Sequence, residues 1–375
     1  MTGATLFYGA STKEADLLYL SGFAAPDPFA FALVGEQKVL FASDLEYDRA
    51  RRTARADQVV RFMEIQKELQ EKGENRTDAL ACAARWLADR GVDRLEVPGT
   101  FPLEGGDWLR EAGFAVTPAA GSLAPGRRCK GKEEIELIRR TQEINEEAVR
   151  QGIELIGAAG VADDGTLTQG GEPLTSERVR AAIQTALAAR DCFSEGTIVA
   201  GGEQACDPHD AGSGPLRAGT FIIIDVFPRS LVHFHHADMT RTVLKGRARP
   251  EQRAHYEAVL AGQEWAIGQI AAGAAVREIH LGIHRIFAER GFESGLIEGR
   301  MQGFFHGTGH GVGLEIHEAP RFSDCDGAFA AGDVVTVEPG LYYAGRGGVR
   351  IEDMVVVEEG GCRNLTRMAK DYEVE

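Results

Sequence analysis

Hydrophobic and polar positions follow two different patterns along the chain, and the pattern changes near residue 125. Before that point, short apolar runs alternate with amphipathic segments. In chain order they predict a β-hairpin over 29–41 with its turn at Gly35, helices over 56–72 and 77–90, and a strand at 95–97. Because strands and helices alternate, the first part of the chain is expected to form a mixed α/β domain.

A polar segment around Pro125 and Gly126 separates this region from a longer one. In residues 133–156, apolar side chains recur every three or four positions with charges between them, which predicts a long amphipathic helix. We therefore expect two domains, over 1–127 and 128–375. Two domains are also the number expected from the usual domain size for a chain of 375 residues.

Two segments of the second domain repeat one pattern. Residues 218–225 and 331–338 both begin with Ala-Gly, continue into four mostly β-branched or aromatic residues, and end in an acid. Each predicts a turn that leads into a buried strand, so the domain is expected to consist of two related halves. A carboxylate at the end of a buried strand is costly without a partner, and the final acids, Asp225 and Glu338, therefore imply a nearby cation.

The composition limits the classes of partner. Lys and Arg number 41 against 57 Asp and Glu, a formal net charge of −16, and most of the excess acid follows residue 130. This balance argues against nucleic acid and against an anionic membrane surface. The apolar runs are too short to span a membrane, no signal peptide is evident, and the six cysteines form no C-x-x-C motif. We expect a cytoplasmic protein with reduced thiols.

Four segments carry candidate chemistry. They are Asp225 to Asp238, the glycine-rich run His306-Gly-Thr-Gly-His310-Gly-Val-Gly with His317 after it, Glu338-Pro-Gly, and Arg350-Ile-Glu352. Three of them place acids on predicted strands, and the glycines of the other leave room for close approach around its histidines. Four carboxylates and an imidazole form an oxygen-rich donor set, which suits manganese, cobalt or zinc better than it suits a structural thiolate site.

With these motifs the sequence resembles the pita-bread metallopeptidases, which include methionine aminopeptidase, aminopeptidase P and prolidase, and their metal-free relative creatinase. The five dinuclear-metal ligands of that family match, in order, Asp225, Asp238, His310, Glu338 and Glu352. Residues 15–23 resemble the start of the N-terminal domain in the creatinase and prolidase branch. The resemblance implies an α+β chain with a pita-bread catalytic domain behind a smaller mixed α/β domain. It also implies two divalent metal ions per chain and a homodimer.

The resemblance also implies roles for single residues. Asp238 and Glu352 would bridge both metals, Asp225 would chelate one of them, and His310 and Glu338 would complete the other. Glu338 would also accept the proton of the attacking water. His317 would contact the substrate carbonyl, His209 would face the substrate, and His306 would lie near the proline pocket.

Two further residues are assigned to substrate binding from strand alternation. Arg350 stands two positions before Glu352 and is expected to share its strand face, where it would orient that carboxylate or bind the substrate's C-terminus. The stretch between Asp225 and Asp238 departs from the family because it is longer and contains His233-Phe-His-His236. Alternation would place His236 on the face of Asp238, with a structural role as the alternative.

The predicted function is hydrolysis of the Xaa-Pro bond at the N-terminus of dipeptides or short peptides, with manganese as the expected metal. The choice between a dipeptidase and an aminopeptidase stays open. Two alternatives are a creatinase-like hydrolase of a small guanidino compound and a non-enzymatic pita-bread binding protein, and the complete ligand set disfavours both. His280 and His284 lie four apart on a helix predicted over 276–290, and we interpret them as packing or surface residues because no carboxylate accompanies them.

Overall fold

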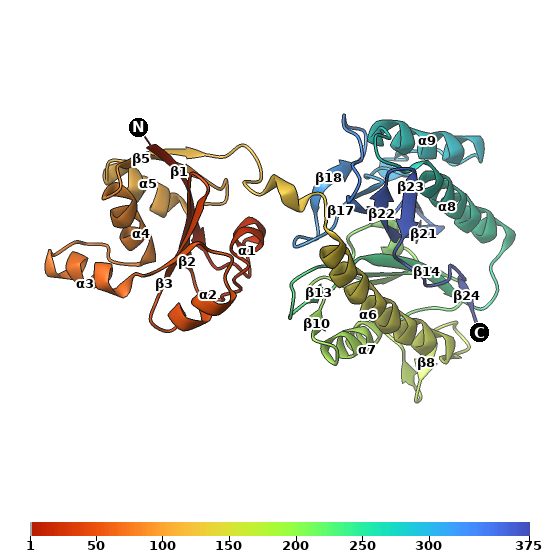
Figure 1. Ribbon diagram of the computed structural model, residues 1–375. Helices are drawn as coiled ribbons and strands as arrows, with labels where there is room; N and C mark the ends of the chain where they lie inside the picture. The colour runs from red at the N-terminus through yellow and green to blue at the C-terminus, as the bar shows by residue number, and fades with distance from the viewer. Residues whose placement is uncertain (1) are drawn as a thin grey trace. The chain divides into compact units, whose positions relative to one another are not determined.

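The computed structural model describes residues 2–375 and divides into two compact units, Met1–Arg127 and Arg128–Glu375 (Figure 1). Each unit has hydrophobic clusters of its own. None of the helices in residues 2–375 has both the length and the apolar character that a bilayer span requires.

The first unit is a single mixed sheet covered by helices. Its strands are β1 (Thr2–Gly9), β2 (Phe29–Val34), β3 (Gln37–Ala42), β4 (Gln58–Arg61), β5 (Val92–Val97) and β6 (Ala115–Pro118), in the order β4-β3-β2-β1-β5-β6. Its helices are α1 (Ala15–Ser21), α2 (Tyr47–Thr53), α3 (Met63–Glu71), α4 (Ala79–Ala88) and α5 (Leu103–Glu111), and a short 3₁₀ turn, η1 (Pro125–Arg127), closes the unit. Apolar side chains of α4 and α5 belong to one hydrophobic cluster, and those of α1 and α2 belong to another.

The sequence predictions for this unit are confirmed in part. The β2–β3 hairpin forms with Gly35 in its turn at a φ of 61°, and α4 begins after Asp78, whose carboxylate accepts a hydrogen bond from the backbone of Ala81. The single helix predicted over 56–72 is wrong, because β4 occupies its first part and α3 begins only at Met63. Val59 and its β-branched neighbour suit a strand, and Val59 pairs with Leu40 of β3.

The second unit contains two main sheets. The first runs β11 (Ile198–Gly201), β12 (Phe221–Val226), β14 (Met239–Lys245), β24 (Glu373–Val374), and the second runs β18 (Glu318–Phe322), β17 (Gly309–Gly311), β19 (Val334–Val337), β22 (Asp353–Glu358), β23 (Gly361–Asn364). Smaller sheets pair β7 (Gly160–Val161), β8 (Leu167–Gln169) and β9 (Glu172–Pro173); β10 (Cys192–Phe193) and β13 (Arg229–Ser230); β15 (Gly295–Ile297) and β16 (Arg300–Gln302); and β20 (Gly340–Tyr343) and β21 (Gly347–Arg350). The helices are α6 (Lys132–Gly157), α7 (Ser176–Ala188), α8 (Pro250–Gln269) and α9 (Val276–Glu289), with a short 3₁₀ turn, η2 (Gln204–Cys206).

The two main sheets have matching helix layers, which agrees with the two halves predicted from the sequence repeat. Side chains of α6 and α7 pack with β12 and β14 in one hydrophobic cluster, and those of α8 and α9 pack with β19 and β22 in another. The repeated segments become β12 and β19, which both lie inside their sheets with a neighbour on each side. The acid that ends each repeat is thereby carried on a strand whose backbone is held from both edges.

The helix α6 confirms the prediction over 133–156, but its buried face is less apolar than its periodicity indicates. Gln142, Asn145 and Glu146 are all buried. The Nδ2 atom of Asn145 donates a hydrogen bond of 2.6 Å to the carbonyl of Val226, at the end of β12. Glu146 accepts a hydrogen bond from the backbone N–H of Arg367, and Gln142 donates one to the hydroxyl of Thr366, so these polar groups are partnered although they are buried.

Candidate metal centre

Five segments of the second unit carry the predicted ligands to one cavity of about 940 Å³. Asp225 lies in β12, Asp238 directly precedes β14, His310 is the middle residue of β17, Glu338 directly follows β19, and Glu352 lies between β21 and β22. All five side chains line the cavity. Residues that are separated by as many as 127 positions in the sequence therefore reach one site.

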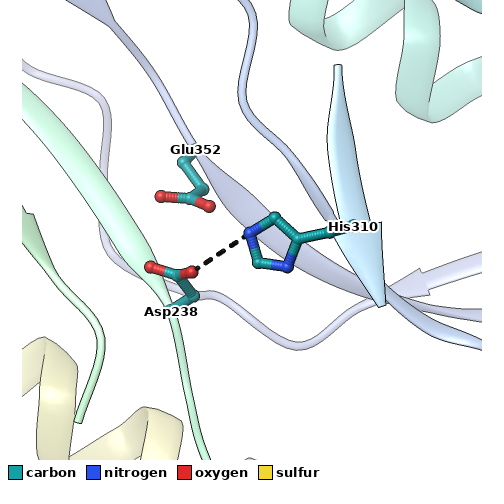
Figure 2. A group of neighbouring side chains, drawn as sticks. All are labelled: Asp238, His310 and Glu352. Carbon is teal, nitrogen blue, oxygen red and sulfur yellow. Dashed lines mark ion pairs between the residues drawn. The ribbon is translucent and has the colours of Figure 1, made fainter. Parts of the chain in front are cut away.

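Three of these side chains form a compact group, shown in Figure 2. Asp238, His310 and Glu352 each offer a ligand atom, and these three atoms lie within 4.8 Å of one another. The Nε2 atom of His310 is 3.6 Å from Oδ2 of Asp238 and 3.5 Å from Oε1 of Glu338. Its Nδ1 atom lies 3.2 Å from the carbonyl of Gly311, which fits a tautomer with Nδ1 protonated and the Nε2 lone pair directed at the carboxylates.

Threonine hydroxyls support two of the carboxylates. Oγ1 of Thr240 donates a hydrogen bond of 2.8 Å to Oε2 of Glu352, and Oγ1 of Thr336 donates a longer one, 3.4 Å, to Oε1 of Glu338. Oγ1 of Thr336 also accepts a hydrogen bond from the backbone of His310. Such contacts fix the direction of a ligand without occupying all of its lone pairs.

The electrostatics of the cluster favour a cation. Burial raises the pKa of Asp238 well above its usual value, and the nearby carboxylates of Glu352 and Asp225 add to the effect. Burial raises the pKa of Glu352 in the same way, and it raises the pKa of Glu338 to about 7 although the neighbouring arginine opposes the shift. Within residues 2–375, Oδ1 of Asp225 and Oδ1 of Asp238 are buried and have no hydrogen-bond partner. The donor set therefore fits divalent metal ions, which would satisfy these oxygens and offset the charge.

Arg350 contacts a different carboxylate from the one expected. Its Nη2 atom lies 2.6 Å from Oδ2 of Asp225, and the side chain is almost fully buried. Strand alternation predicts a contact with Glu352, but β21 ends at Arg350 and Glu352 lies beyond the regular strand, so the two residues do not share a strand face. The pair leaves Oδ1 of Asp225 as the atom available to a metal.

A hydrogen-bonded chain links Arg350 to His306 through a tyrosine that sequence reasoning missed. The hydroxyl of Tyr342 accepts a hydrogen bond of 2.9 Å from Nη1 of Arg350 and lies 2.9 Å from Nε2 of His306. Burial and the nearby Arg350 lower the pKa of His306 to about 3, so this imidazole is neutral. Tyr342 follows Glu338 by four positions in a fully buried strand. A tyrosine in an apolar segment so near a candidate ligand is the sequence feature that could have indicated a polar role.

The other predicted histidines differ in position. His317 and His209 line the cavity, and the rings of His317 and His310 are 4.3 Å apart in an edge-on arrangement. Burial and the neighbouring His310 lower the pKa of His317. In the described chain, His236 is not among the residues that line the cavity, and its backbone N–H donates to the carbonyl of Gly313. Alternation fails there because regular β14 pairing begins only at Met239.

The glycines around His310 are required by the close packing of β17 between its neighbours. A Cβ atom added to Gly309 would lie 2.1 Å from the carbonyl oxygen of Thr336, and one added to Gly311 would lie 2.2 Å from that of Ala319. Either contact would displace the strand. The glycine-rich run is therefore a structural requirement for bringing His310 to the cavity.

His280 and His284 pack as interpreted from the sequence. Nδ1 of His280 lies 2.8 Å from Oγ1 of Thr308, and the rings of both histidines contact Phe304. Neither lines the cavity in the described residues.

The two helix-covered halves with acids between them form the pita-bread architecture expected from the sequence, and the group of Asp238, His310 and Glu352 could hold a metal ion. Residues 136–359 match the model of metallopeptidase family M24, and the chain belongs to this family. Among known proteins, the chain is 29% identical to the Xaa-Pro dipeptidase of Pyrococcus furiosus over 364 residues, which are 96% of this chain and 93% of that protein.

Solved structures and a bacterial relative extend the comparison. The crystal structure of the prolidase from Pyrococcus horikoshii aligns with 99% of this chain and 95% of its own, at a TM-score of 0.79 and 26% identity. The Xaa-Pro aminopeptidase 2 of Streptomyces coelicolor is 38% identical over 198 residues, which are 46% of this chain and 42% of that protein. The X-Pro aminopeptidase of Thermotoga maritima also has the same fold over the full chain, with a TM-score of 0.80 at 23% identity, over 100% of this chain and 98% of its own.

Proposed function

We propose that this protein is a dinuclear metal-dependent peptidase that hydrolyses the Xaa-Pro bond at the N-terminus of dipeptides or short peptides. The observation that carries the proposal is the convergence of four carboxylates and His310 on one cavity, with two buried carboxylate oxygens that have no partner among residues 2–375. The full-length similarity to an Xaa-Pro dipeptidase supports the choice of substrate.

In this proposal Asp225, Asp238, His310, Glu338 and Glu352 hold two metal ions, with manganese as the expected metal. Bound divalent ions supply Lewis acidity, which polarises the carbonyl of the bond to be cleaved. Glu338 is the proposed acceptor of the proton that the attacking water loses, and its raised pKa suits that task near neutral pH.

The cavity histidines are proposed to contact the substrate. His317 is neutral because burial lowers its pKa, so it can donate one hydrogen bond to the substrate carbonyl oxygen as charge develops there. His209 lies on the cavity wall in a turn that is fixed by a hydrogen bond from its backbone N–H to Oδ1 of Asp207. His306 supports Arg350 through Tyr342 and is proposed to act on the proline side through this chain.

The cavity also contains a feature that favours a dipeptide. Arg321 lines the wall four positions after His317, and its side chain is exposed. A guanidinium there can pair with the free carboxylate of a short substrate. We therefore favour the dipeptidase over the aminopeptidase, and Arg321→Ala should raise KM for an Xaa-Pro dipeptide more than for a C-terminally amidated Xaa-Pro tripeptide.

The proposed function is tested with purified full-length protein loaded with manganese, cobalt or zinc. We expect release of the first amino acid from Xaa-Pro dipeptides, and loss of this activity to background in Asp238→Ala. Asp44→Ala is the matched control, because Asp44 is an exposed aspartate whose partner is Arg61 of the first unit. Fully metal-loaded wild type that cleaves neither dipeptides nor longer Xaa-Pro peptides would contradict the proposal.

The two alternatives give different results in the same experiment. A creatinase-like hydrolase would convert a guanidino compound in the presence of a chelator, and a binding protein would take up metal without turnover. The unpartnered carboxylate oxygens disfavour a metal-free hydrolase, since it would leave them unsatisfied.

A further inference from the structure

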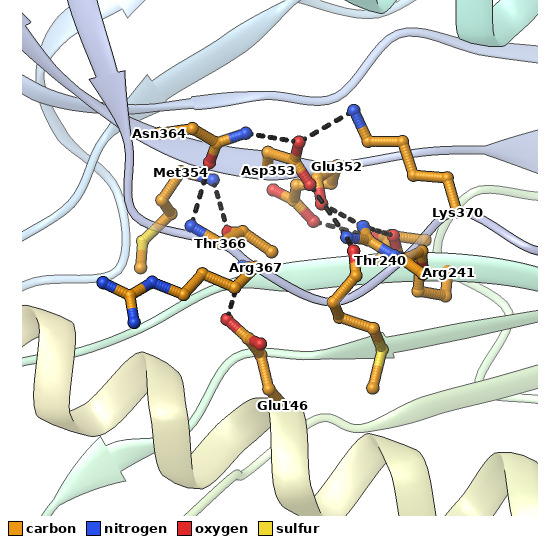
Figure 3. Close-up of polar contacts among 12 residues, drawn as sticks. Glu146, Thr240, Arg241, Glu352, Asp353, Met354, Asn364, Thr366, Arg367 and Lys370 are labelled. Carbon is orange, nitrogen blue, oxygen red and sulfur yellow. Dashed lines mark hydrogen bonds and ion pairs between the residues drawn. The ribbon is translucent and has the colours of Figure 1, made fainter.

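Behind the candidate metal centre lies a buried arginine that the proposed chemistry does not use. Arg241 is 1% exposed and stands in β14, three residues after Asp238. Its guanidinium donates hydrogen bonds to the carbonyls of Thr240 (3.0 Å), Glu352 (2.7 Å), Met368 (2.7 Å) and Ala369 (3.1 Å), and to Oδ1 of Asp353 (2.9 Å), as Figure 3 shows in part. All five N–H groups of an arginine can be used in such an arrangement.

Asp353 is the counter-charge of Arg241. Its side chain is 1% exposed, and its Oδ2 atom accepts hydrogen bonds from Nδ2 of Asn364 (2.8 Å) and Nζ of Lys370 (2.9 Å). Asp353 directly follows Glu352, whose side chain lines the cavity. The carboxylate of Glu352 thus faces the cavity, whereas the carboxylate of Asp353 accepts a hydrogen bond from the arginine behind it.

The arginine has a specific task because Glu352 lies between two strands. Its carbonyl is buried outside the regular ladder, and the hydrogen bond from Arg241 satisfies it. The backbone N–H of Glu352 donates to the carbonyl of Thr240 at 3.1 Å, and its carboxylate accepts from Oγ1 of the same threonine. Glu352 is thus held at three points by two consecutive residues of β14, the strand that begins directly after Asp238.

We infer that Arg241 and Asp353 are positioning residues that set the separation of the Asp238 and Glu352 carboxylates and thereby the affinity for metal. The inference rests on the proposed function, because it takes both carboxylates as ligands. A buried ion pair contributes little net stability compared with apolar packing, whereas its charge-assisted hydrogen bonds have fixed directions. The pair fixes the position of β14 in one half relative to the β21–β22 connection in the other half.

The test compares two isosteric substitutions, Asp353→Asn and Asp333→Asn. Asp333 is equally buried in the same unit and pairs with Arg128 at 2.8 Å, but that arginine donates to the carbonyl of Ala328 and not to that of a candidate ligand. Manganese affinity is measured by titration calorimetry on metal-free protein, and thermal unfolding is measured on the same samples. Both substitutions should lower the unfolding temperature, whereas Asp353→Asn alone should weaken manganese binding by about tenfold or more.

Equal manganese affinities in the two folded variants would overturn the inference. If Asp353→Asn does not fold, Asn364→Leu is the substitute, because Asn364 is exposed and supplies one of the contacts to Asp353. It should weaken manganese binding by less than the roughly tenfold expected of a direct outer contact, because it reaches Glu352 only through Asp353 and Arg241, and wild-type affinity in this variant would overturn the inference. A wild type that binds manganese but cleaves no Xaa-Pro substrate would defeat the proposed function and leave the affinity comparison valid.

Discussion

In both halves of the second unit, a helix side chain holds the end of the strand that carries a candidate ligand, but the side chain is not the same residue type. In the first half, Asn145 of α6 donates a hydrogen bond to the carbonyl of Val226, which follows Asp225. In the second half, Gln263 of α8 donates one to the carbonyl of Val337, which precedes Glu338. A helix amide therefore holds the strand end beside the candidate ligand in each half, although the strand residue that it holds differs.

The halves differ in where the strand ends relative to the candidate ligand and in the length of that ligand's side chain. Asp225 is inside β12 and pairs with Thr240 across the ladder, whereas Glu338 lies one residue beyond the end of β19. The first half places an aspartate, and the second places a glutamate, which is one methylene longer. We conclude that side-chain length compensates for where each strand ends, so the two related strands still deliver their carboxylates to one cavity.

The largest loss of activity is expected when the aspartate and the glutamate are exchanged in length. Glu338→Asp withdraws the carboxylate by about 1.5 Å, and Asp225→Glu extends the other toward Arg350, which already lies 2.6 Å from it. We expect each variant to lose about a hundredfold in kcat/KM for an Xaa-Pro dipeptide, because small misplacements of reacting groups have effects of that size. Retention of near wild-type kcat/KM in Glu338→Asp would show that the position of the strand end does not require the longer acid there.

Removal of the two supporting hydroxyls should have smaller and unequal effects. Thr240→Val deletes the 2.8 Å hydrogen bond to Glu352, and Thr336→Val deletes a bond of 3.4 Å to Glu338, which is near the limit for a hydrogen bond. We expect losses in kcat/KM of about tenfold for the first and about threefold for the second. The measurement is steady-state kinetics at saturating manganese, and the reverse order would contradict the geometry.

Loss of the helix amides should mainly affect stability. Asn145→Ala and Gln263→Ala each leave a buried strand carbonyl without a donor, which should lower the free energy of unfolding by about 1–3 kcal/mol. Gln263 also accepts a hydrogen bond from Lys370, so its variant should be the less stable of the two. Denaturant unfolding of the folded variants measures this, with the exposed Gln151→Ala on α6 as the control that should change little.

The candidate ligands could be found from the sequence because each one ends or interrupts an apolar segment. An acid in that context stands out in a linear pattern, and Asp225 and Glu338 also occur in a repeat. The contact between Arg350 and Asp225 could not be found in this way, since it joins residues that are 125 positions apart and depends on how two sheets meet. The same holds for Tyr342, whose hydroxyl gains its importance only from its neighbours.

The errors come from applying a regular period where the backbone is irregular. Phe234 adopts a φ of 65°, and the chain around it is not extended, so alternation could not place His236. The strand β4 was mistaken for helix because four residues are too few to distinguish the two periods. The polar face of α6 was hidden in its sequence, since a buried glutamine or asparagine has the same spacing as an apolar residue.

The contacts of Arg241 also determine when the candidate metal site can form during synthesis of the chain. Its acceptors at Glu352 and Ala369 are 111 and 128 positions later in the chain. A nascent chain that has exposed Asp225 and Asp238 therefore still lacks both the opposing acids and the residues that hold them apart. If the five proposed ligands hold the metal, its uptake is expected as a late event, after residues 352–370 have left the ribosome, because an ion that meets only Asp225 and Asp238 finds two of the five.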